Sequence, residues 1–102
     1  MASRLNLHEE LCEILELRSV YFQPPASVQM TYPAIRYSLS GMDRKSANNK
    51  DYLRTNRYEV IAIVYDPDSD VVEKMLDHFA MCSFDRHYVS DNLNHFVFTI
   101  YY

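Results

Sequence analysis

Apolar and polar positions alternate most clearly in the last third of the chain, over residues 81–89 and again over residues 95–102. A period of two is typical of strands that bury one face. Only a short polar connection separates these runs, so we expect a hairpin. Residues 57–65 contain a continuous apolar run from Val60 to Tyr65, which predicts a central strand covered on both faces.

Two other segments have the spacing of amphipathic helices. The first is predicted over residues 3–17, where the apolar stripe consists of Leu7, Leu11, Ile14 and Leu15. The second follows the acidic stretch 66–70, and its apolar face consists of Val71, Val72, Met75, Leu76 and Phe79. Shorter strands are predicted over residues 20–22 and 34–39, each bounded by proline.

This order of elements predicts a single α+β domain over residues 1–102. We expect a mostly antiparallel sheet of four to five strands, with two helices packed on one face. Residues 40–56 are polar and show no periodicity, so they are predicted to form a long polar loop between two strands.

Composition excludes several classes of protein. A hydrophobic content of 48% is too high for a disordered chain, and the net charge of −4 disfavours nucleic acid as the main partner. No apolar run approaches the roughly 18 residues of a membrane span. The first residues lack the apolar segment of a secretory signal, so we expect synthesis in the cytoplasm and no membrane partner.

Catalytic motifs are missing from the sequence. Phosphate-binding loops need several glycines, and Gly41 is the only glycine in the chain. Neither a nucleophile elbow nor an HExxH motif occurs. Cys12 and Cys82 cannot form a tetrahedral zinc site alone and are expected to be small buried hydrophobes. We therefore predict no enzyme activity, no catalytic residues, no metal and no cofactor.

Two acidic patterns allow other interpretations. Asp66, Asp68 and Asp70 have the spacing of the first calcium ligands in an EF-hand loop, but Val71 stands where the turn needs glycine. An acidic helix N-terminus is the preferred interpretation. A metal-dependent hydrolase is the other alternative, and it would use the possible ligands His87, His95, Asp85 and Asp91. Surface strand residues explain that group better, because it has no fixed ligand spacing.

The predicted loop is the main candidate for a binding site. Residues 43–57 contain five basic and two acidic side chains, a local charge of +3, while the rest of the chain carries −7. Such asymmetry lets a basic segment bind the acidic body of another copy, or DNA. The loop residues expected to bind a partner are Arg44, Lys45, Lys50 and Arg54.

Aromatic side chains are a second candidate. Nine tyrosines and five phenylalanines exceed the needs of one small core, and tyrosine is favoured at interfaces because its ring is apolar and its hydroxyl polar. Core packing could absorb any of them. The expected subunit contacts are Tyr52, Tyr65, Tyr101 and Tyr102.

Two stretches of the sequence resemble the small neck and tail proteins of long-tailed bacteriophages, of the tail-terminator or tail-completion type. One comprises residues 49–61 (NKDYLRTNRYEVI) with 65–70 (YDPDSD), and the other residues 81–95 (MCSFDRHYVSDNLNH). The resemblance implies an α+β subunit that forms a ring, commonly a hexamer. Such a ring caps the tail tube and joins it to the head connector at the head–tail junction. The family's long loop, here residues 40–56, reaches a neighbouring subunit or the lumen.

The leading hypothesis is therefore a non-enzymatic virion subunit, assembled in the bacterial host cytoplasm. Its expected partners are copies of itself, the tail tube protein and the head connector or stopper proteins. DNA passing through the lumen would be contacted without sequence specificity. The alternative is a small regulatory or ligand-binding α+β domain without catalysis, acting as a monomer or dimer.

Overall fold

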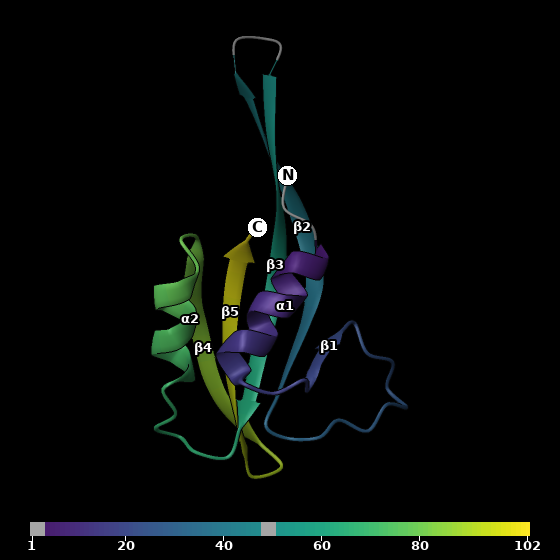
Figure 1. The fold of residues 1–102 in the computed structure, drawn as a ribbon, viewed down its shortest axis with the longest axis vertical. Coiled ribbons are helices and arrows are strands. Elements are labelled where there is room, and N and C mark those ends of the chain that lie inside the picture. The colour runs from purple at the N-terminus through teal and green to yellow at the C-terminus, as the bar shows by residue number, and fades with distance from the viewer. Residues whose placement is uncertain (1–3, 48–50) are drawn as a thin grey trace.

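The computed structural model describes residues 4–47 and 51–102 and has an α+β fold (Figure 1). Within these ranges lie two helices and one five-stranded sheet. The elements in chain order are α1 (Arg4–Leu15), β1 (Val20–Phe22), β2 (Ala34–Ala47), β3 (Asp51–Val64), α2 (Val71–His78), β4 (Cys82–Ser90) and β5 (Leu93–Tyr101). The predicted fold class, with a mostly antiparallel sheet, is confirmed.

The sheet has the strand order β1-β2-β3-β5-β4. β1 runs parallel to β2, and all other neighbours are antiparallel. β3 is central, as its apolar run predicts, and it pairs with β2 on one side and β5 on the other. The described edge strands are therefore the three-residue β1 and the nine-residue β4.

Both helices pack on one face of the sheet (Figure 1). α1 buries Leu7, Leu11 and Ile14, which share one side of the helix at spacings of four and three residues. α2 contributes Val71 and Met75 to the same core. The strand residues of this core are Val20, Ile35, Tyr37, Tyr58, Val60, Ala62, Val64, Phe96, Phe98 and Ile100.

The opposite face of the sheet has a smaller core. It contains Ile61, Ile63, Leu93 and Val97, and Met30 and Tyr32 pack against it from the connection between β1 and β2. Because strand residues alternate between faces, Ile61 and Ile63 belong to this core while Val60 and Ala62 belong to the other. The apolar run in β3 is thus explained by cover on both sides.

The loop expected over residues 40–56 is instead a hairpin. β2 and β3 stay paired from Ala34↔Ile63 to Ala47↔Asp51, and residues 48–50 lie outside the described ranges. The prediction was wrong because hydrophobic periodicity reports burial on a core, and this part of the hairpin extends past the core. β5 accompanies β3 only as far as the Arg57↔Tyr101 pair, and β1 accompanies β2 only to Tyr37.

We call residues 41–57 the arm. Figure 1 shows its two strands projecting beyond α1 and beyond the C-terminus, along the longest dimension of a molecule that measures 50 × 28 × 22 Å. At its base the register shifts between Leu39 and Gly41, so Ser40 forms a bulge. The Ser40 hydroxyl donates to the Arg57 carbonyl oxygen at 3.0 Å. A bulge bends its strand and increases the local twist, so it sets the direction of the arm.

Candidate functional site

The described strands of the arm contain Arg44, Lys45 and Arg54, three of the four basic residues predicted to bind a partner. Their ladder places Arg44 directly opposite Arg54, Lys45 opposite Leu53, and Ser46 opposite Tyr52. The side chains of residues 43–54 lie outside the described part of the structure, and so does the whole of Lys50. The backbone register nevertheless puts two arginines at one rung, although like charges directly opposite each other destabilise a pair of strands.

The two C-terminal tyrosines have different surroundings. Tyr101 is half-buried opposite Arg57, at the base of the arm. Tyr102 packs edge-on against Phe79 with 6.2 Å between ring centroids, and its hydroxyl donates to the Glu10 carboxylate. Burial and then Glu10 raise the pKa of Tyr102 to about 12. Tyr102 therefore makes its contacts within its own chain, while Tyr101 lies next to the arm.

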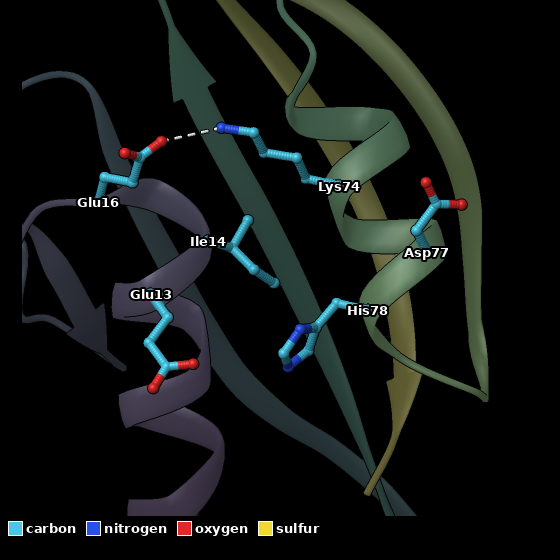
Figure 2. Close-up of a pocket in the computed structure, with 6 residues that line it drawn as sticks. All are labelled: Glu13, Ile14, Glu16, Lys74, Asp77 and His78. Carbon is cyan, nitrogen blue, oxygen red and sulfur yellow. Dashed lines mark hydrogen bonds and ion pairs between the residues drawn. The ribbon is translucent and has the colours of Figure 1, made fainter.

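A groove with a volume of about 450 Å³ runs between the two helices (Figure 2). Three of its lining side chains are carboxylates, Glu13, Glu16 and Asp77. Lys74 Nζ lies 3.0 Å from a Glu16 oxygen, and the same ammonium lies 3.6 Å from Asp70. The helix layer thus presents an acidic surface at this groove, and the ammonium of Lys74 there is already paired with carboxylates.

Glu10 joins both helices to the C-terminal strand. One of its carboxylate oxygens accepts from Tyr102, and the other lies 2.8 Å from His78 Nε2 on α2. The backbone N–H of Tyr102 donates to the carbonyl oxygen of Asn56 at 2.9 Å, where the arm leaves the sheet. These bonds fix the helix layer relative to the arm.

The structure does not bring His87 and His95 together. His87 pairs with Phe96 and stacks on its ring, on the helix side of the sheet. His95 pairs with Tyr88 and stacks on it with 4.7 Å between ring centroids, and alternation puts this pair on the other side. Among the described residues no group of three or more His, Cys, Asp or Glu side chains could hold a metal ion. The proposed hydrolase site therefore has no geometric support.

Asp85 and Asp66, which belong to the two alternative metal-binding patterns, accept hydrogen bonds within the fold. Asp85 accepts from Thr99 Oγ1 at 2.6 Å. Asp66 Oδ1 accepts from the N–H of Asp68 at 2.9 Å, as in a turn, and α2 begins directly after Asp70. The acidic stretch is thus a turn leading into a helix, which agrees with the preferred interpretation.

Both cysteines are free thiols. Cys12 is buried in the helix-side core, and Cys82 is half-buried at the start of β4. Burial, followed by the nearby Asp85, raises the pKa of Cys82 to about 11. A thiol that stays protonated at neutral pH is a poor nucleophile, so Cys82 does not form a reactive site.

Sequence reasoning missed the open edge of the sheet at β4. Every residue of this strand after Cys82 is exposed, including Phe84, Tyr88 and Val89. Its alternation predicted a strand, but alternation cannot tell an edge strand from an inner one. A signal was present in the charged run from Asp85 to His87, because charged side chains are common on edge strands.

No model of a protein family matches the chain, and a search of curated proteins gave no significant match. In the ranges that the structure describes, every helix is too short or too polar to cross a membrane.

Proposed function

We propose that this chain is a non-enzymatic structural subunit of a tailed-phage virion, of the tail-terminator or tail-completion type. It forms a ring at the head–tail junction, where it caps the tail tube and joins the head connector. The observation that carries the proposal is the arm, a basic hairpin that leaves a compact acidic body (Figure 1). The sequence resemblance supplies the place in the virion.

The arm is poorly suited to exist alone. A two-stranded hairpin without a core is marginally stable in water. The Arg44↔Arg54 rung adds repulsion to that deficit. Contact with an acidic surface reduces both effects. Its negative charges offset the repulsion between like charges, and the contact excludes water from the hairpin. We infer that the arm is ordered by a partner.

The acidic body of a second copy is such a partner. The arm segment 43–57 carries +3 and the remaining residues carry −7. Contact between two different patches of identical subunits is heterologous, and it gives a ring when the rotation closes. DNA passing through the lumen offers the same attraction through its phosphates, without reading of sequence.

Charge reversal in the arm tests this proposal. The quadruple variant with Arg44→Glu, Lys45→Glu, Lys50→Glu and Arg54→Glu should stay folded but lose the ring. The loss should appear in native mass spectrometry or light scattering, while circular dichroism stays unchanged. A smaller test is the double variant Arg44→Glu with Arg54→Glu. Its matched control, Arg18→Glu with Arg36→Glu, makes the same charge change on the body instead of the arm.

Two results would contradict the proposal. A quadruple variant that still forms normal rings and infectious particles would remove the role of the arm. A wild-type chain that stays monomeric at every concentration, with and without tail tube protein, would favour the alternative of a small regulatory or ligand-binding domain without catalysis.

A further inference from the structure

We infer that the β4 edge of one copy pairs antiparallel with the free edge of β2 in the arm of the next copy, so that neighbouring sheets become continuous. This inference rests on the proposed ring and names the strands that build it. The occupant of the β4 edge is thus a second copy of this chain. Four observations support it.

The first observation is that two sheet edges are open. β4 has β5 as its neighbour on one side and no described strand on the other. β2 is covered by β1 only at Ile35, Arg36 and Tyr37, and the Gln23 side chain then accepts from the N–H of Leu39. From Gly41 to Ala47 the outer edge of β2 has no described partner strand. Open edges offer rows of unpaired backbone groups that bind another strand.

The second observation is the direction of the strands. β2 and β5 are both antiparallel to β3, and β4 is antiparallel to β5. β4 therefore runs opposite to β2. Two copies placed side by side in the same orientation bring these edges together as an antiparallel pair, and no copy has to be turned over. Every helix layer then lies on the same side, so the contact repeats around a ring.

The third observation is the level of the two edges along the strands. The ladder places Cys82 level with Leu39, through Ile100 and Tyr58. To reach residues 41–47, the neighbouring β4 must be displaced along the strands by several residues. Closing a sheet into a barrel requires such a stagger, because the strands tilt relative to the axis. β1 enforces the displacement, since it occupies the β2 edge below the arm.

The fourth observation is the distribution of exposed apolar and acidic groups. On the helix side of β4, Phe84 is 42% and Val89 62% exposed, and on the same side of β2, Leu39 and Met42 are 46% and 54% exposed. Pairing of the two edges covers these side chains. It also brings the basic arm next to α2, where Glu73 and Asp77 are exposed.

Cysteine cross-linking tests the pairing directly. In a chain with Cys12→Ala and Cys82→Ser, a copy carrying Tyr88→Cys is mixed with a copy carrying Asp43→Cys or Ala47→Cys, because the strand register puts these positions on the same side of the sheet as Tyr88. The pairing predicts disulfide-linked dimers in these mixtures. The control copy carries Val28→Cys, an exposed position in the connection between β1 and β2, and it should give only background cross-linking with Tyr88→Cys.

A second variant keeps the test decisive if the cysteine variants fold poorly. Val89→Lys puts a charge on the exposed helix side of β4 and should abolish the ring while the monomer stays folded. Val28→Lys makes the same change on the connection between β1 and β2, and it should leave the ring intact.

The outcomes separate this inference from the function on which it rests. Rings that persist with Val89→Lys, or that give no cross-link between β4 and the arm, overturn the pairing but leave the ring. Cross-linked dimers of the Tyr88→Cys copy alone show a two-fold β4–β4 contact and also overturn it. A wild-type chain that forms no ring overturns both proposals.

Discussion

Asn94 is the one buried polar side chain among the described residues. Its Oδ1 lies 3.0 Å from His87 Nε2, and its Nδ2 donates to the carbonyl oxygen of Tyr65 at 3.0 Å. A buried carboxamide is tolerated when both of its ends are bonded. Asn94 thus connects β4, the end of β3 and β5, at the sheet end opposite the arm.

The thiol of Cys82 should react slowly in the folded protein. Its pKa of about 11, compared with an ordinary value of 9.0, keeps the thiol protonated at pH 8. We predict alkylation by iodoacetamide about a hundredfold slower than in denaturant, measured by mass spectrometry of a Cys12→Ala chain. Because the folded pKa is raised, the contribution to stability is complete below pH 9 and is lost as the pH rises toward 11. Equal rates in both states would contradict this environment.

At the scale of elements, the β4–β5 turn shows how backbone geometry selects residues. Asp91 and Asn92 have φ of 53° and 63°, and they form a two-residue connection between Ser90 and Leu93. Positive φ at both central positions is the geometry of a type I′ turn, which matches the twist of a hairpin. Asparagine and aspartate tolerate this region better than other residues with a side chain.

Substitution at the turn should therefore have a predictable sign. Asn92→Val should lower the free energy of unfolding by about 1–2 kcal/mol, since a β-branched residue is strained at positive φ. Asn92→Gly should not lower it. Chemical denaturation measures both, with Ser83→Val as the control at an exposed strand position. A loss of similar size in the control would show that strain in the turn is not the cause.

The elements that the sequence predicted are those that bury one face. The stripe from Leu7 to Ile14 and the run from Val60 to Val64 are covered by the two cores. The spacing of apolar residues in these segments therefore follows the spacing of buried positions. The arm lies beyond the core, so its sequence shows no such hydrophobic periodicity. The sequence did indicate the arm by charge, since Arg44 and Arg54 stand out in an acidic chain. The open edge of β4 depends on the order of strands in space, which local patterns do not contain.

At the scale of the whole molecule, the helix-side core lies outside the arm. The helix-side core ends at Tyr37 and Tyr58 on the two strands of the hairpin. Tyr37 is also tied to α1, because its hydroxyl lies 2.8 Å from His8 Nδ1 and accepts from Arg4 at 3.2 Å. We therefore predict that the arm, which lies beyond this core, adds little to the stability of the body.

Excision of the arm separates folding from assembly. Met42 pairs with Asn56, so residues 43–55 can be replaced by Asn-Gly, which forms a tight two-residue turn. The backbone bond from Tyr102 to Asn56 is kept. The shortened chain should unfold within about 4–8 °C of the full chain, because a stability change of ~1 kcal/mol shifts the midpoint by that amount. It should form no ring.

Thermal circular dichroism and native mass spectrometry measure these two properties in one preparation. The matched control carries only Asn49→Gly, which introduces an Asn-Gly sequence between the two strands of the arm and keeps both strands and Lys50. It should stay folded and keep the ring. If the shortened chain is unfolded, the arm belongs to the cooperative unit of the body. If it assembles as the full chain does, the subunits bind each other through the body alone, and neither the basic arm nor its pairing with β4 builds the ring.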